Sequence, residues 1–368
     1  MTRKVTVELG PRSYEVQVGP GLLANLGRTA SAIRHVQQAV VIADSTVTGL
    51  YGRQAMHSLA SAGLSAALID FPAGEANKNL ATVGKLCDKL FAVSPAVDRN
   101  CLIVALGGGV PGDVAGMVAA VALRGLRWMQ CPTTLLADVD ASVGGKTGVD
   151  HPAGKNLIGA FHQPSAVLID VRTLKSLPAQ ELRSGLAECV KHAVIRDAEL
   201  LDFVEAQAEA ILACDESTMT DLVARNVEIK AHVVSADERE TGQRAHLNFG
   251  HTVGHAIEAF VGYGKVTHGQ AVSLGMVAAC ILAETKGLID SSLRGRLEAV
   301  MGRLGLEVRL PGLDADQVWN IMQHDKKARG GRLRFVLPTG LGRVDTFDDV
   351  QEQDVKEAIR ALGQPGGR

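Results

Sequence analysis

Residues 101–120 read CLIVALGGGVPGDVAGMVAA, the pattern of a buried β-strand, a glycine loop and the start of a helix. Gly107, Gly109 and Gly112 satisfy the spacing GxGxxG between a strand and a helix, the context in which that motif binds a dinucleotide. Backbone amides at the amino end of such a helix hold pyrophosphate. We therefore predict a nucleotide site here, with Asp113 as the cap of the helix.

The usual dinucleotide fingerprint also needs an acidic residue after the next strand, where it binds the ribose hydroxyls. The next strand, RWMQCP at residues 127–132, carries no acid. Asp44, at the end of an earlier strand, is the candidate to replace it. The prediction is therefore a Rossmann-like site rather than an ordinary Rossmann half.

Short apolar runs alternate with helical segments in the first half of the chain. The runs at 38–43, 66–71, 101–106 and 166–171 predict a mostly parallel sheet covered on both faces, preceded by a hairpin over 3–18. After residue 177 the pattern changes to helices from 180 to 305, followed by a strand pair and a last helix. We predict an α/β domain over 1–175 and an all-α domain over 176–368.

Composition excludes several classes of partner. Lys and Arg number 38 against 40 Asp and Glu, and aromatic residues make up 4%, so neither a nucleic-acid nor an anionic-membrane surface is expected. No apolar run is long enough to span a membrane. The six cysteines lack CxxC spacing, which favours a reducing cytoplasm.

A second glycine-rich segment, DVDASVGGKTGVDHPAGKN at 138–156, contains GKT but is not a nucleoside triphosphate loop. That loop needs glycine at position 140, which is aspartate. We predict instead a bent loop that gathers Asp140, Lys146, Lys155 and Asn156 around a phosphate monoester. The alternative is a solvated surface loop.

Three histidines lie within RAHLNFGHTVGHAIEAFVGYGKVTH at 244–268. His251 and His255 are four apart on a predicted helix, so both imidazoles project from one face and can share a Zn²⁺ ion, with a carboxylate completing the set. His268 is the third. The alternative is that these histidines are solvated or satisfied by hydrogen bonds.

Charged side chains in the second half predict an anionic small-molecule substrate. Glu188 and Lys191 lie one helical step apart in an apolar segment, so they are expected to face inward and to need partners there. The alternative is a surface ion pair. Further positive charge comes from Lys230, Arg244, Lys326 and Lys327.

Taken in order, these segments resemble the 3-dehydroquinate synthase family over essentially the full length. The resemblance is carried by GGGVPGD, RGLRWMQCPTTLLADVDASVGGKTGVDHPAGKNLIGAFHQP, GLAECVKHAVI, DERETGQRAHLNFGHTVGHAIE, THGQAVSLGM and DKKARGGRLRFVLP. It implies an NAD-binding α/β domain, a helical domain that binds metal and substrate, an active site between them, and a homodimer.

The implied reaction is a step of the shikimate pathway toward chorismate and the aromatic amino acids. A lyase converts 3-deoxy-D-arabino-heptulosonate 7-phosphate to 3-dehydroquinate and phosphate. The steps are NAD-dependent oxidation, β-elimination of phosphate, reduction, ring opening and aldol closure, with Zn²⁺ or Co²⁺ as the metal.

The resemblance also assigns residues. The implied metal ligands are Glu188, His251 and His268, which makes His255 a substrate contact. The NAD contacts are Asp44, Glu75, Lys78, Gly108, Gly109, Asp113, Thr133 and Thr134, to which we add Lys146 and Lys155. The substrate contacts are Asp140, Lys146, Asn156, Lys191, Lys230, Arg244, Asn248, His255 and one of Lys326 and Lys327. Arg124 resembles the arginine that reaches the phosphate site of the partner subunit.

Two positions depart from the family pattern: Asp138 stands where a neutral residue is usual, and Gln270 where glutamate is usual. Related cyclases that make inososes or valiolones share the NAD and metal motifs, but Lys230, Arg244, Asn248 and His255 together favour a substrate that carries a carboxylate. A metal-dependent polyol dehydrogenase is a further alternative, and the phosphate-type loop argues against it. A silent NAD or metal sensor is disfavoured by the intact ligands.

Overall fold

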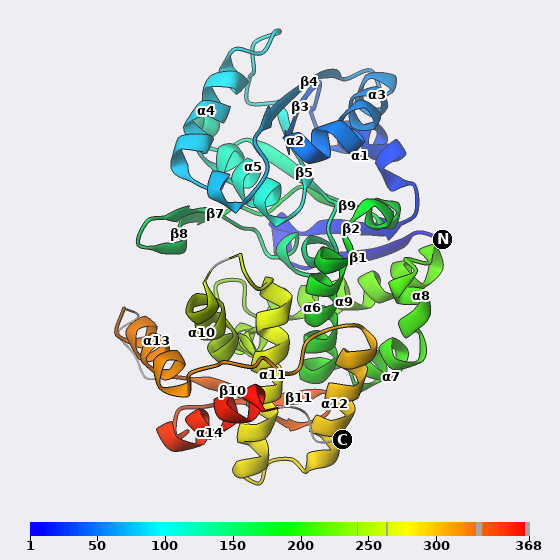
Figure 1. The fold of residues 1–368 in the computed structure, drawn as a ribbon. Helices are drawn as coiled ribbons and strands as arrows, with labels where there is room; N and C mark the ends of the chain where they lie inside the picture. Colours follow the sequence, from blue (N-terminus) through cyan, green and yellow to red (C-terminus); the bar gives the residue numbers. More distant parts are fainter. Residues whose placement is uncertain (241, 263, 329–332, 365–368) are drawn as a thin grey trace. The chain divides into compact units, whose positions relative to one another are not determined.

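The computed structural model describes residues 1–240, 242–262, 264–328 and 333–364, without the side chains of 325–328 (Figure 1). The chain forms two compact units. The first contains residues 1–177 and 214–235, and the second contains 178–213 and 236–368. The predicted domains were two continuous ranges, and the observed division differs from them at residues 214–235.

The first unit is built on a seven-stranded sheet of order β1-β2-β9-β6-β5-β3-β4. Its strands are β1 (Arg3–Val7), β2 (Tyr14–Gly19), β3 (Gln38–Asp44), β4 (Ser65–Phe71), β5 (Leu102–Gly107), β6 (Arg127–Pro132) and β9 (Ala166–Asp170). All pairings are parallel except the hairpin of β1 with β2. The mostly parallel sheet, its four apolar strands and the first hairpin are thus confirmed.

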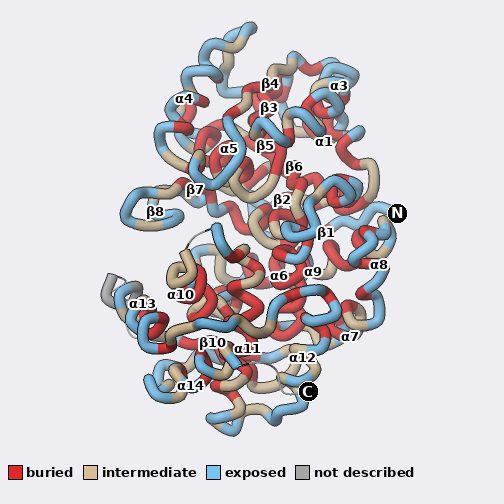
Figure 2. The backbone as a smooth tube through the Cα atoms, viewed as in Figure 1, coloured by how far each residue is buried: buried red, intermediate tan, exposed pale blue. Residues whose placement is uncertain are grey.

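Alternate residues of the central strands face two separate cores. Val41 and Val104 pack on the side of α1 (Leu26–Ala32) and α3 (Arg53–Ser61), whereas Val40 and Ile103 pack on the side of α4 (Leu80–Phe91) and α5 (Gly109–Val121). A strand buried on both faces needs apolar side chains at successive positions. This explains the unbroken Val, Ile and Leu runs, and Figure 2 shows these strands as buried.

Shorter elements complete the first unit. They are the antiparallel hairpin β7 (Lys146–His151) and β8 (Gly154–Phe161), helix α2 (Ser45–Val47) and the short turns η1 (Gly10–Arg12), η2 (Leu22–Asn25), η3 (Thr48–Gly52), η4 (Glu75–Asn77), η5 (Ala122–Arg124), η6 (Ala137–Ala141) and η7 (Val171–Ser176).

Helix α9 (Glu216–Ala236) accounts for the segment that the domain prediction assigned to the second half. Asp221 pairs with Arg3 of β1 at 3.0 Å, and Glu216 pairs with Lys175 at 2.7 Å. Helical periodicity identifies such a segment as a helix, but it carries no information on which core the helix covers.

The second unit is helical. It contains α6 (Ala179–Arg196), α7 (Ala198–Ala206), α8 (Ala208–Leu212), η8 (Gln243–Asn248), α10 (His251–Val261), α11 (His268–Thr285), α12 (Ser291–Arg303), α13 (Ala315–Ala328), the hairpin β10 (Phe335–Gly340) with β11 (Arg343–Phe347), and α14 (Glu352–Gly363). The predicted late strand pair and last helix are confirmed. Helix α11 contacts α6, α10, α12, α14 and β10, and most of its residues are buried. None of the helices in the described ranges is long and apolar enough to cross a membrane.

Asp138, one of the two departures from the family pattern, is a fully buried acid in η6. Neither carboxyl oxygen has a hydrogen-bond partner in the described part of the chain. Burial, reinforced by the negative charge of Asp170, raises the pKa of Asp138 well above its usual range. Burial therefore favours the neutral, protonated form of this side chain.

We expect Asp138→Asn to stabilise the protein increasingly as pH rises. The unfolded chain loses this proton near pH ~4 and the folded chain only at a higher pH, so between these two pKa values the wild type loses up to about 1.4 kcal/mol of stability per pH unit. The neutral amide removes this loss. Urea midpoints of both proteins at pH 5, 6.5 and 8 measure the effect, and a difference that does not grow with pH contradicts it.

Candidate active site

The strand order reverses between β3 and β5: β4 lies beyond β3 on one side, and β6 lies beyond β5 on the other. In a sheet of this kind ligands bind beyond the carboxyl ends of the strands at the reversal. Asp44 ends β3, Gly107 ends β5 and Thr133 directly follows β6. The topology therefore brings the predicted NAD contacts on these loops to one edge of the sheet.

The glycine loop after β5 leaves space at its last position. A Cβ atom at Gly107 would lie 2.5 Å from Pro111, and one at Gly108 would lie 2.8 Å from Thr134, so the packing of the loop itself requires both glycines. At Gly109 the nearest atom would be 3.9 Å away, in Ala141. The amino end of α5 is thus open to a ligand, as a pyrophosphate site requires.

The prediction that Asp113 caps α5 is wrong. The capping position is Gly108, and Asp113 lies within the helix. Its carboxylate instead pairs with the buried Lys78, whose Nζ lies 2.6 Å from Asp113 Oδ2 and donates to Asn156 Oδ1 at 2.5 Å. Burial raises the pKa of Asp113, and the Lys78 ammonium offsets part of that increase. Lys78 therefore joins α5 to the β7–β8 hairpin.

The second glycine segment is a hairpin, which corrects part of the phosphate-loop prediction. Lys146 opposes Phe161 at one end of the hairpin, whereas His151 opposes Gly154 at the other, next to Lys155. Lys155 lies about four residues along the strands from Lys146, and strands advance about 3.3 Å per residue, so the backbones of the two lysines are roughly 14 Å apart. The two lysines therefore stand on the two strands of a hairpin rather than on one compact loop.

Asp140 and Lys230 are brought together within the first unit. The Lys230 ammonium contacts both the carboxylate and the backbone carbonyl of Asp140. Lys230 is buried and lies on α9, 90 residues from Asp140 in sequence. A substrate anion at this point would meet a lysine whose charge is held in place by the carboxylate.

Close packing of glycines brings three helices of the second unit together. A Cβ atom at Gly275 in α11 would lie 1.8 Å from the carbonyl oxygen of Gly250, which caps α10. A Cβ atom at Gly269 would lie 2.4 Å from Ser184 in α6. Side chains from α6, α10 and α11 can converge only because these backbones touch.

Glu188 of α6, His251 of α10 and His268 of α11 form a candidate metal site, with one donor atom from each within 4.8 Å of the others. Glu188 Oε1 is 3.6 Å from His251 Nε2 and 3.4 Å from His268 Nε2. Donor atoms around a tetrahedral zinc lie about 3.3–3.5 Å apart. The donor set and its spacing both fit a catalytic zinc-type ion with three protein ligands.

The simple pairing of His251 with His255 is not what the geometry favours. The His255 ring lies 5.2 Å from the His251 ring and 5.8 Å from the His268 ring, so it is adjacent to the cluster. The carboxylate, however, is approached by His251 and His268. Helical spacing alone cannot reveal a ligand that arrives from another helix.

Burial and neighbouring charges shift the pKa values of all three residues in the cluster. Burial raises the pKa of Glu188, but Lys191 and the two imidazoles more than offset it and hold that pKa well below its usual range. Burial, reinforced by Lys191, lowers the pKa of His251 to about 3. Burial by itself lowers the pKa of His268. Glu188 and Glu258 raise that pKa by more than burial lowers it, to about 9. Glu188 and Lys191 both face inward, as predicted, and they pair with one another.

We expect metal binding to release about one proton below pH ~9. A metal ligand must be a neutral imidazole, and at pH 7 His251 is already neutral whereas His268 is protonated. Apparent affinity for Zn²⁺ should therefore fall about tenfold per pH unit from pH 8 to pH 6. Competition with a chelator of known pH dependence measures this slope, and a flat profile contradicts it.

The remaining predicted residues are distributed as follows. Arg244 is buried and donates to the Glu238 carbonyl at 2.5 Å, and Asn248 donates to Glu240 at 3.4 Å. Gln270 forms a capping box with Thr267, so its amide performs the role that glutamate has in that motif. The side chains of Lys326 and Lys327 lie outside the described residues.

Two carboxylates beside predicted site residues were not identified from the sequence. Glu240 accepts the bond from Asn248, and Glu258 has Oε2 3.9 Å from His268 Nδ1. Glu258 is seven residues after His251 and three after His255, which places it on the same face of α10. From that spacing the sequence could have predicted that Glu258 lies beside the histidines.

Solved structures identify the class of the fold. A 2-epi-5-epi-valiolone synthase from Streptomyces hygroscopicus subsp. jinggangensis with NAD⁺ and Zn²⁺ bound is 31% identical, with a TM-score of 0.86 over 95% of this chain and 96% of its own. A 2-deoxy-scyllo-inosose synthase complexed with carbaglucose-6-phosphate, NAD⁺ and Co²⁺ is 27% identical, with a TM-score of 0.87 over 98% and 100%. The fold is that of the sugar phosphate cyclases.

Sequence comparison then identifies the family. The amino-terminal domain of 3-dehydroquinate synthase matches residues 68–184, and its carboxy-terminal domain matches 185–328. A 3-dehydroquinate synthase from Symbiobacterium thermophilum is 47% identical over 97% of this chain and 99% of its own length. The chain belongs to the 3-dehydroquinate synthase family, as its motifs indicated.

Proposed function

We propose that the protein is a 3-dehydroquinate synthase that converts 3-deoxy-D-arabino-heptulosonate 7-phosphate to 3-dehydroquinate and phosphate in the shikimate pathway. The observation that carries this proposal is the convergence of Glu188, His251 and His268 in a chain that matches this family over nearly its full length. The six cysteines lie at described positions and form no disulfide with one another, which supports a cytoplasmic location.

The two units have different roles in this proposal. The first binds NAD at the carboxyl edge of its sheet, where Asp44, the open position at Gly109 and Thr133 come together. The second binds Zn²⁺ or Co²⁺ through its Glu-His-His cluster. When bound, the metal would supply a Lewis acid for a substrate hydroxyl, and NAD would supply a reversible hydride acceptor.

The residues of the chain hold the two ends of the substrate. Lys146 and Asn156 bind the phosphate, while Lys230 and Arg244 bind the carboxylate, so that the reacting carbons stay aligned. A ketone next to the C–H bond makes that proton acidic, and phosphate leaves by β-elimination. Ring opening and aldol closure of the product enol follow. Two fixed ends confine these steps to one conformation of a flexible sugar.

We further propose that the enzyme is a homodimer in which Arg124 completes the phosphate site of the second copy. Arg124 is exposed, and it and Leu123 have positive φ angles of 65° and 49°. Left-handed backbone at successive residues other than glycine is costly and is retained mainly where function needs it. Leu157 and Phe161 on β8 are 62% and 50% exposed, which supports burial against a second copy.

Subunit complementation tests the dimer. Arg124→Ala and Lys146→Ala are each expected to be nearly inactive alone. Mixed and re-equilibrated, they should recover up to about 25% of wild-type activity, because half of the dimers are mixed and each contains one intact site. No recovery, in a mixture shown to exchange subunits, contradicts the contribution of Arg124 across the dimer.

A product assay tests the reaction itself. Purified protein with the heptulosonate phosphate and trace NAD should release phosphate and 3-dehydroquinate in equal amounts without lasting NADH absorbance. A chelator should abolish both. NADH accumulation without phosphate release would instead indicate a dehydrogenase, and turnover of a sugar phosphate that lacks the carboxylate would indicate another cyclase.

A further inference from the structure

Glu258 is a carboxylate in a place where carboxylates are rarely found. It lies in α10 with its side chain 8% exposed, next to the buried Ile257 and Ala256. Carboxylates are almost never buried unless they are paired, because burial penalises their charge. The residue therefore needs a partner that repays this cost.

One partner of Glu258 is the imidazole of His268. Glu258 Oε2 lies 3.9 Å from His268 Nδ1, and the other ring nitrogen, Nε2, lies 3.4 Å from Glu188 Oε1. The ring thus stands between two carboxylates, one at each nitrogen. The Glu258 carboxylate is within ion-pair distance of Nδ1, and its negative charge favours a proton on that nitrogen. The Nε2 lone pair is then directed at Glu188, the position that a shared cation would occupy.

At His251 the partner of Nδ1 is a backbone carbonyl within hydrogen-bond distance. Its Nδ1 donates to the Phe249 carbonyl at 3.1 Å, and its Nε2 faces Glu188 at 3.6 Å. The His251 side chain is 14% exposed, whereas the His268 side chain is 32% exposed and begins its helix. His268 therefore has less packing around it to fix the orientation of its ring.

We propose that Glu258 is a positioning residue for the metal site, a role that rests on the proposed metal-dependent function. It fixes the Nδ1–H tautomer and the orientation of His268, so that Nε2 is the ligand atom. Its negative charge also makes the imidazole a stronger donor to a divalent cation. Removal of such a partner typically lowers metal affinity 10- to 100-fold.

The test measures metal affinity rather than turnover alone. Metal-free wild type, Glu258→Leu and Glu258→Gln are titrated with Zn²⁺ and Co²⁺ in competition with a chromophoric chelator. The leucine variant should bind about 10- to 100-fold more weakly. The glutamine variant should lose part of this affinity, less than about tenfold, because it keeps a polar side chain of the same size beside the ring but lacks the negative charge. NAD affinity should not change.

Glu298→Gln is the matched control. It removes a carboxylate of similar charge from α12, where Glu298 pairs with Arg294 and Arg309 and contacts none of the three histidines in the described ion pairs. Its metal affinity should equal that of the wild type. If the leucine variant does not fold, the comparison of Glu258→Gln with Glu298→Gln decides, and equal affinities overturn the proposal.

The outcomes separate this inference from the proposed function. A wild type that binds neither metal would overturn the metal-dependent function itself. A wild type that binds metal, together with a folded leucine variant whose affinity is within twofold, would overturn only the role of Glu258. A leucine variant with weakened binding and a glutamine variant with partial rescue support the proposal.

Discussion

Replacement of His268 by alanine is expected to abolish metal binding and turnover together. His268 is one of three donors, and its Nε2 lies 3.4 Å from the Glu188 carboxylate. With two protein ligands left, the site loses the minimum set typical of a catalytic zinc. Turnover should fall by about 10³-fold or more, because the metal contributes several kcal/mol of charge stabilisation.

His255→Ala is the matched control for that experiment. His255 is equally close to the cluster, with its ring 5.2 Å from that of His251, but its proposed role is substrate contact. We expect this variant to keep one metal per chain and to lose activity through weaker substrate alignment. Elemental analysis of both dialysed proteins gives the answer. Full metal in His268→Ala, or metal loss only in His255→Ala, would restore the His251–His255 pair as the ligands.

This distinction marks the limit of what local sequence patterns predict. The α/β architecture was accessible because strands buried on both faces need continuous apolar runs, and residues 39–43 and 101–106 contain no polar side chain. The glycine loop was accessible because its spacing lies between a strand and a helix. Both features are encoded within about 20 consecutive residues, as such fingerprints are.

The metal cluster is encoded differently. Glu188 and His268 are 80 residues apart and lie on helices that meet through Gly269 and Ser184. Nothing in the period of either helix reports that contact. Family resemblance suggested the ligand set because it compares whole chains, whereas the i, i+4 argument considers one helix at a time.

The prediction of a bent loop over 138–156 missed the β7–β8 hairpin for a related reason. Lysines and glycines in one short segment suggested a compact loop, but β7 and β8 pair as a hairpin and place Lys155 about four residues along the strands from Lys146. Composition predicts that a segment can bind an anion, whereas the strand pairing decides which of its side chains can do so together. Asn156 reaches Lys78, which lies far away in sequence.

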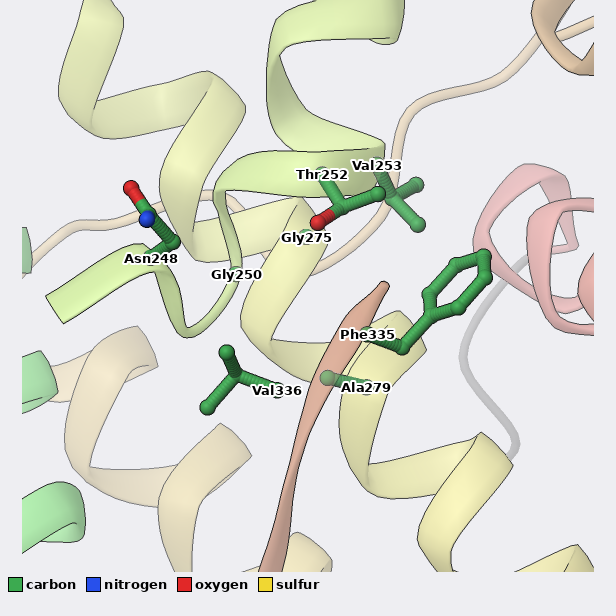
Figure 3. Close-up of a pocket in the computed structure, with 8 residues that line it drawn as sticks. All are labelled: Asn248, Gly250, Thr252, Val253, Gly275, Ala279, Phe335 and Val336. Atoms are coloured by element: carbon green, nitrogen blue, oxygen red, sulfur yellow. The ribbon is translucent and has the colours of Figure 1, made fainter. Parts of the chain in front are cut away.

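Replacement of Gly275 by alanine is expected to cost both stability and the metal site. The added Cβ would lie 1.8 Å from the Gly250 carbonyl oxygen and 2.9 Å from the Gly254 amide nitrogen, so α10 and α11 would have to move apart. Figure 3 shows Gly250 and Gly275 in this region beside Phe335 and Val336 of β10. Overpacking against rigid backbone costs about 3 kcal/mol or more.

The loss of metal follows from the sequence of α10. His251 directly follows Gly250, so a shift of that backbone carries its imidazole away from Glu188, and metal affinity should fall at least about 100-fold.

Gly295→Ala in α12 is the control, because its added Cβ meets nothing within 4 Å. In that exposed helix interior alanine should stabilise by about 0.5–1 kcal/mol. Urea midpoints and metal titrations of both variants test the pair. If Gly275→Ala behaves like Gly295→Ala, the two helices are not in contact through these glycines, and another constraint must bring His251 to Glu188.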